Sequence, residues 1–163
     1  MACLGGAHFT LTQGAKRAAG PVHAWTLNDD NPITLSDDLR LRAKMHFVVL
    51  DQSPRRRGER FRVTTKGYMY EVLRRDGVEL FSAHWHPVSR LSNYDGPHYH
   101  ICAPALSTTG VFMERAHLPT HRVSFEEFIR ICISQFGVSP AVPDWEQRLD
   151  ATEQRFKEHR SWG

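Results

Sequence analysis

The sequence lacks the features of secreted, membrane and zinc-ribbon proteins. It has only three cysteines in 163 residues, widely spaced and without a C-x-x-C pair, so neither a disulfide framework nor a structural zinc ribbon organises the fold. No apolar run of about 20 residues is present, and the first residues lack the continuous apolar segment of a secretory signal. We therefore expect a cytoplasmic protein in a reducing compartment, with no membrane partner.

An excess of charge of one sign is also absent. The formal net charge is only +3, too small by itself to indicate a nucleic-acid-binding protein, although the distribution of charge can matter more than the total. Apolar residues make up 40% and charged residues 24% of the chain, which is typical of a globular protein long enough for one domain. Residues 1–31 are rich in Gly, Ala and polar residues without a sustained period. We expect a flexible or loosely packed arm there, and a single domain over residues 32–163.

Alternating and apolar runs predict an antiparallel β-meander of four or more strands. The run LRAKMHFVVL over residues 41–50 is the first strand, and RFRVTTK over residues 60–66 begins the second, which continues past Gly67 through a bulge. Asp76-Gly77 is a strong hairpin signal that leads into a third strand ending in HWH. A fourth strand is expected at PHYHICA.

Two helices are predicted after this meander. Ser124 and Glu127 have capping-box spacing before an amphipathic run, and Gly137 stands where a left-handed helix terminator belongs. A second helix is expected to begin near Asp144. Residues 103–123 form a less regular connector with a short strand at residues 111–113. The predicted fold class is α+β, with both C-terminal helices packed on one face of the sheet.

The most informative stretch, between His84 and His121, contains six of the ten histidines. Four of them form two H-x-H pairs, at the end of the third strand and in the fourth. Side chains two apart in a strand point to the same face, so neighbouring strands would place four imidazoles on one surface. We assign the aromatic positions of these strands to the core and the histidines to the opposite face. The predicted site is therefore His84, His86, His98 and His100.

One interpretation of this surface is general acid–base cleavage of RNA without a metal or other cofactor. A neutral imidazole takes a proton from the ribose 2′-hydroxyl, and a protonated one delivers a proton to the leaving oxygen. Candidates to steady the anionic phosphate or bind the substrate are Lys66, Arg74, Arg90, Tyr94 and Tyr99. The segment SPRRRGER adds Arg55, Arg56 and Arg57 on a predicted loop, where arginines can contact phosphates without reading sequence.

A second interpretation gives the same four histidines to zinc or another divalent metal. Three imidazoles leave one coordination position open for water, as in hydrolytic zinc sites. No H-E-x-x-H motif is present, and few carboxylates are expected nearby: Asp95 and Glu114, with Glu79 at the far end of its strand. His117 and His121 have H-x3-H spacing, but Pro119 lies between them, so a zinc-finger-like clip is not expected.

Residues 68–138 resemble TumE-type toxins of bacterial toxin–antitoxin systems. The matching features are the hairpin YEVLRRDGVELFSAHWHP, a polar Asn-Tyr-Asp turn, the segment PHYHI, and a connector leading into a helix. This resemblance points to His84 or His86 and to Pro97, His98 and His100, and it implies an RNA-directed toxin with an antitoxin partner.

Three functions are therefore left open. The leading prediction is a small toxin-like ribonuclease that uses the four histidines. The first alternative is a metal-dependent hydrolase or metal-binding protein at the same cluster. The second is a non-enzymatic protein-binding module of a toxin–antitoxin, phage or defence system.

Overall fold

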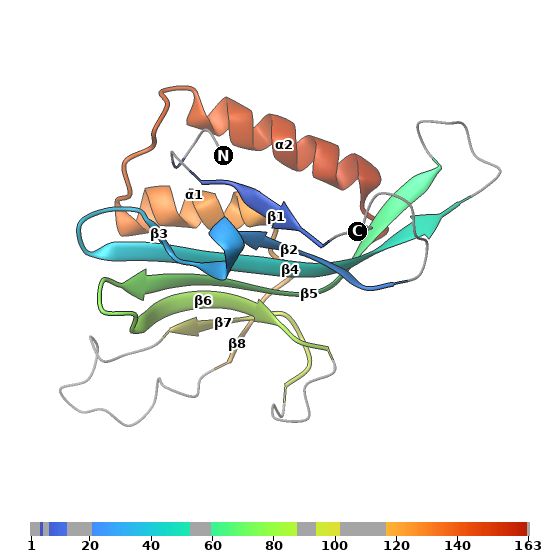
Figure 1. Ribbon diagram of the computed structural model, residues 1–163, viewed down its shortest axis with the longest axis horizontal. Helices are drawn as coiled ribbons and strands as arrows, with labels where there is room; N and C mark the ends of the chain where they lie inside the picture. Colours follow the sequence, from blue (N-terminus) through green and yellow to red (C-terminus); the bar gives the residue numbers. More distant parts are fainter. Residues whose placement is uncertain are drawn as a thin grey trace.

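A computed structural model describes residue 4 and residues 7–12, 21–52, 60–87, 94–101 and 117–162. Within these residues the chain forms one antiparallel sheet followed by two helices on one side of it (Figure 1). This confirms the predicted α+β class and the meander with two C-terminal helices. No described helix is both long enough and apolar enough to span a membrane.

The strands follow one another across the sheet nearly in chain order, each antiparallel to its neighbour. One short strand, β3 (Ile33–Thr34), lies outside this order and pairs with β4. A 3-10 turn at Asn28–Asp30 precedes it. The path itself is β1 (Phe9–Leu11), β2 (His23–Leu27), β4 (Leu39–Asp51), β5 (Phe61–Arg74), β6 (Glu79–Trp85), β7 (His98–Ile101) and β8 (Leu118–Pro119).

The described part of residues 1–31 contributes two strands to the sheet. The strands β1 and β2 extend the sheet beyond β4, and Leu27 is fully buried. The Trp25 ring stacks on Tyr70, with centroids 6.1 Å apart. These strands are short and are held by pairing with β4, which is distant in the sequence, so local composition gave no signal for them.

The long β4–β5 ladder contains the bulge predicted at Gly67. His46 pairs with Gly67, but Phe47 pairs with Thr65, so Lys66 is the extra residue. The β5–β6 hairpin turns at Gly77, whose φ of 88° suits glycine, as the Asp76-Gly77 signal predicted. The bulge sets the register of β5 against β4, and the hairpin, with an irregularity between Val72 and Leu73, sets the register of β5 against β6.

Side-chain alternation gives the sheet two different faces. The face toward the helices, here called the inner face, buries apolar and aromatic side chains against Phe128, Ile129 and Cys132 of α1 (Phe125–Phe136). Its fully or nearly fully buried sheet residues are Leu41, Ala43, Tyr68, Tyr70, Val72 and Ala83. The opposite face, here called the outer face, carries the polar side chains of the same strands, including the histidines of β6 and β7.

Both helices begin where the sequence predicts. The Ser124 hydroxyl accepts a hydrogen bond from the Glu127 backbone N–H, and Gly137 ends α1 with a φ of 66°. The second helix, α2 (Trp145–His159), follows Asp144 and buries Leu149. The short strand expected at residues 111–113 lies outside the described residues.

Gly67 also sets how closely β5 approaches β6 beside the histidines. A Cβ atom at this position would lie 2.9 Å from the backbone oxygen of Trp85, which stands between His84 and His86. We expect Gly67→Ala to lower the free energy of unfolding by about 1–3 kcal/mol, since backbone must move to relieve the contact. Urea unfolding of purified protein measures this. A loss below about 0.5 kcal/mol would show that the approach of the two strands is not constrained.

Candidate metal centre

The cross-strand register brings both H-x-H pairs together on the outer face. His84 pairs directly with His98, and Ser82 pairs with His100. The ring centroids of His84 and His100 are 4.9 Å apart, and those of His98 and His100 are 4.7 Å apart. His86 lies at the border of the group, 5.4 Å from His84. The predicted sharing of one face by these four residues is confirmed.

A fifth imidazole, that of His117, joins the group from the residue just before β8. The pairs His98–Pro119 and Tyr99–Leu118 place His117 opposite His100. Its ring centroid lies 4.7 Å from those of both His98 and His100. The sequence analysis left His117 without a role because β8 is a two-residue strand containing proline, too short to produce an alternating pattern. We call His84, His86, His98, His100 and His117 the histidine cluster.

Three members of the cluster have the spacing of a metal site. His84, His98 and His100 each offer one ring nitrogen, and these nitrogens lie within 4.8 Å of one another. A tetrahedral zinc ion with bonds of about 2.0–2.1 Å holds its nitrogens about 3.4 Å apart. Small side-chain rotations therefore suffice to bring the three nitrogens around one ion.

The hydrogen bonds of two rings orient them for such a role. The Nδ1 of His98 lies 2.7 Å from the backbone oxygen of Gly96. Because that oxygen can only accept, Nδ1 carries the hydrogen and Nε2 keeps its lone pair, the arrangement common in metal-bound histidines. The Nε2 of His84 is buried and has no hydrogen-bond partner among the described residues. An unsatisfied buried nitrogen is costly unless something binds it.

Two carboxylates lie beside His84 and were not assigned to the site from the sequence. Glu71 is 5% exposed in its side chain, receives a 2.6 Å hydrogen bond from Arg42, and lies 3.9 Å from the Nε2 of His84. Glu79 accepts a hydrogen bond from Ser82, and its carboxylate joins Glu71 and His84 in a second group within 4.8 Å. Glu79 does begin β6, at the far end of the strand from His84 as expected from the sequence, but its carboxylate comes close to His84. Its side chain reaches back along β6.

Burial lowers the pKa values of four histidines of the cluster, His84, His86, His98 and His100. The pKa of His84 is lowered to about 3, first by burial and then by the nearby His100, His86, His98 and His117. Burial is also the first cause of the lowered pKa values of His86, His98 and His100. Neutral imidazole is the form that binds metals. A general acid, in contrast, requires a protonated ring.

The other predicted substrate contacts are only partly near the cluster. The Tyr94 ring lies 5.4 Å from that of His98. Arg74 is paired with Asp76 at the β5–β6 hairpin, and its strand partner is Leu39, so the structure does not bring it to the histidines. Lys66 is exposed at the bulge. Arg55, Arg56, Arg57 and Arg90 lie outside the described residues.

Comparison with known proteins found no matching family model, no matching curated protein and no matching solved structure. The resemblance to TumE-type toxins therefore stays a prediction from the motifs, and the site is interpreted from its own geometry.

Acid should destabilise the metal-free protein through His84. Its pKa is about 3 in the folded state and about 6.5 in the unfolded state. Between these values the unfolded chain binds more protons, so stability falls as the pH falls, by up to about 1.4 kcal/mol per pH unit for this group. His86, His98 and His100 add to the same trend.

The prediction is tested by urea unfolding between pH 7.5 and 4.5 with a chelator present. We expect His84→Leu, which keeps the volume but removes the titrating group, to reduce the pH slope below pH 6. Parallel stability curves for the wild type and this variant would contradict the prediction.

Proposed function

We propose that the protein binds one divalent transition-metal ion through His84, His98 and His100 and uses it to hydrolyse phosphodiesters of RNA. The observation that carries the proposal is the convergence of three ring nitrogens within 4.8 Å of one another. The unpartnered Nε2 of His84 supports it. The first of the two alternatives from the sequence, a metal-dependent hydrolase, is thus preferred over metal-free acid–base cleavage.

The donor set favours zinc among the common metals. Imidazole nitrogens suit zinc, copper, iron and nickel, whereas magnesium and calcium prefer oxygen ligands. Three histidines are the protein ligands of a hydrolytic zinc site whose fourth position holds water, and the metal lowers the pKa of that water to about 7. Such a site supplies a hydroxide nucleophile at neutral pH without needing a protonated histidine.

His117 and Tyr94 are our candidates for handling protons and substrate beside the metal. The His117 ring touches the rings of His98 and His100, and Tyr94 stacks on His117 with centroids 6.1 Å apart. Both adjoin the three converging ligands without being among them, so a water or leaving oxygen at a bound metal would lie beside them. Glu71 and Glu79 partly balance the positive charge that a metal brings.

The substrate class is inferred from the charges on the same face. Arg40, Arg42 and Lys44 alternate with buried residues along β4, and Lys44 pairs with Met69, which pairs with His84. The electrostatic influence of Lys44 and His46 reaches His86 and helps lower its pKa. Arg42 and Lys44 also have acidic neighbours, Glu71 and Asp30. A row of basic side chains beside a hydrolytic metal suits a polyanion, and phosphate contacts need no sequence reading.

Metal content is the first test. Protein purified without a metal-affinity tag should contain close to one equivalent of zinc or another transition metal by elemental analysis. We expect His98→Ala to weaken zinc binding by at least about 100-fold, because loss of a direct ligand exceeds the 10–100-fold effect of residues behind the ligands. His159→Ala, at the end of α2, is the matched control and should bind as wild type. Equal zinc affinity of all three proteins would reject the site.

Measurements of RNA cleavage distinguish the metal-dependent mechanism from the alternative functions. With single-stranded RNA, chelation should abolish cleavage, added zinc should restore it, and His98→Ala should lower the rate by about 100-fold or more. Cleavage that persists in chelator and depends on the histidines would instead support metal-free acid–base catalysis. Metal binding without RNA cleavage would support a metal-binding protein. A co-purifying partner protein, together with a His98→Ala variant whose metal content and activity equal those of the wild type, would support the protein-binding module.

The basic side chains along β4 predict how RNA affinity depends on salt concentration. For a 2′-O-methyl RNA with a chelator present, so that neither 2′-hydroxyl attack nor metal-dependent hydrolysis consumes the ligand, Lys44→Ala should reduce the slope of log affinity against log salt by about 0.7. Lys157→Ala on α2 is the control and should leave the slope unchanged. Identical slopes would mean that the substrate does not cross β4.

A further inference from the structure

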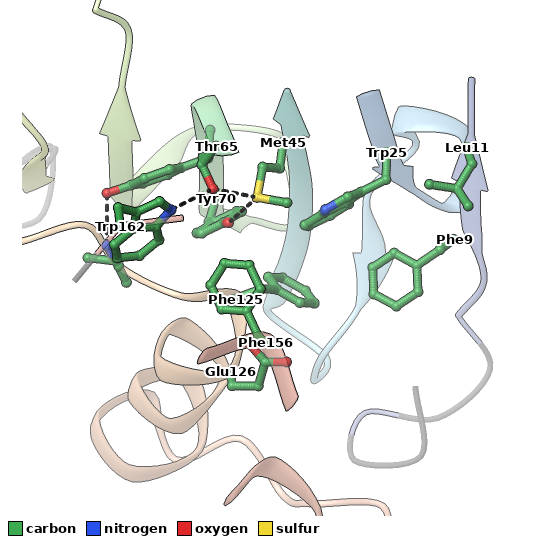
Figure 2. A pocket seen from close by; sticks show the side chains of 12 residues that line it. Phe9, Leu11, Trp25, Met45, Thr65, Tyr70, Phe125, Glu126, Phe156 and Trp162 are labelled. Atoms are coloured by element: carbon green, nitrogen blue, oxygen red, sulfur yellow. Dashed lines mark hydrogen bonds between the residues drawn. The ribbon is translucent and has the colours of Figure 1, made fainter. Parts of the chain in front are cut away.

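The space between the inner face and the helices contains a cavity of about 340 Å³. It lies on the opposite side of the sheet from the histidine cluster. Ligand pockets for small molecules have volumes of about 300–1,000 Å³, so this one can hold a compact molecule. Figure 2 shows side chains from β1, β2, β4, β5 and the helices surrounding it.

Aromatic rings form most of its wall. Trp25 meets Phe9 edge to face at 5.1 Å and Phe125 at 5.2 Å, and Tyr70 lies 5.3 Å from Phe125. Phe156 and Trp162 complete the aromatic lining from the C-terminal part of the chain (Figure 2). Rings in these orientations offer both faces and edges, which suits a flat aromatic ligand.

Two hydroxyl groups at the cavity, those of Tyr70 and Thr65, donate only to a weak acceptor, although Thr65 also accepts a 3.4 Å hydrogen bond from the Trp162 indole N–H. Tyr70 is 1% exposed, and its hydroxyl donates to the sulfur of Met45 at 3.8 Å; Thr65 donates to the same sulfur at 3.7 Å (Figure 2). A thioether is a weak acceptor. Two buried hydroxyls that share one weak acceptor would gain from a carbonyl or hydroxyl oxygen on a ligand.

The charge of the lining excludes anions. Among the described residues around the cavity there is no Lys, Arg or His, and Glu126 contributes a carboxyl group. Burial raises the pKa of this carboxyl, which indicates a site unfavourable to negative charge. Access is provided at β1, where Phe9 is 44% and Leu11 52% exposed although both line the cavity. Apolar side chains exposed at the mouth of a pocket are typical of ligand sites.

We propose that this cavity binds an uncharged, flat aromatic molecule that carries a hydrogen-bond acceptor oxygen, with Tyr70 as the donor to that oxygen. The cavity lies on the other face of the sheet from the histidine cluster and shares none of the cluster's side chains. The protein therefore has a second binding site in addition to the histidine cluster.

The test uses three probes of nearly the same shape, titrated by calorimetry and tryptophan fluorescence. 2-Acetylnaphthalene carries a carbonyl oxygen, 2-ethylnaphthalene carries none, and 2-naphthoate is an anion. We expect saturable one-to-one binding, with the highest affinity for 2-acetylnaphthalene, a lower affinity for 2-ethylnaphthalene and the lowest for 2-naphthoate. Tyr70→Phe should weaken the binding of 2-acetylnaphthalene about 5–10-fold, because one hydrogen bond is lost. The affinity for 2-ethylnaphthalene should not change.

A second variant keeps the test decisive if Tyr70→Phe does not fold. Leu11→Trp fills the exposed mouth of the cavity and should weaken the binding of both neutral probes at least tenfold. Leu118→Trp, at an exposed apolar position on β8 away from the cavity, is the matched control and should bind as wild type. The proposal is overturned if wild-type protein binds none of the probes, binds 2-naphthoate as tightly as 2-acetylnaphthalene, or loses no affinity on Leu11→Trp relative to Leu118→Trp.

Discussion

The pairing of His84 with His98 across β6 and β7 is the contact on which the rest of the structure depends. Because directly paired residues share a face, this one register puts both H-x-H pairs on the outer face and Ala83, Trp85 and Tyr99 on the inner face. A slip by one residue would exchange the two sets. It would place imidazoles among the aromatic rings that α1 covers and would expose those rings, so the core and the histidine cluster enforce the same register.

The histidine cluster is costly to the fold without a bound partner. His98 is 3% exposed and the Nε2 of His84 is buried without a hydrogen bond, whereas buried polar groups are normally paired. Burial also opposes protonation of the rings, which would otherwise repel one another at these separations. The ring nitrogens of His84, His98 and His100 lie within 4.8 Å of one another, so a bound cation would offset this cost by accepting several imidazole lone pairs at once.

The sequence predicts the parts of this arrangement that depend on local chemistry. Asp76-Gly77 marks the hairpin, Gly67 marks the bulge, and Ser124 and Gly137 mark the ends of α1, because each position has a backbone requirement that few residues meet. The shared face of the four predicted histidines follows from strand alternation. In contrast, His117 reaches the cluster only through the pairing of β7 with β8, and β1 and β2 are strands only because β4 is beside them. No local pattern encodes these contacts.

The central strand β5 connects the two candidate sites. Tyr68 and Tyr70 face the aromatic cavity, and Met69 between them faces outward and pairs with His84. The two sites are thus formed by alternate residues of one strand. A substitution that changes the size of a packed side chain on one face shifts the β5 backbone, and this backbone also positions the side chains on the other face. Gly67 strengthens this dependence, because the bulge beside it sets the register of Tyr68 and Met69 while its missing side chain lets β6 approach. A metal held by the outer face would therefore stiffen the same backbone that forms one wall of the inner cavity.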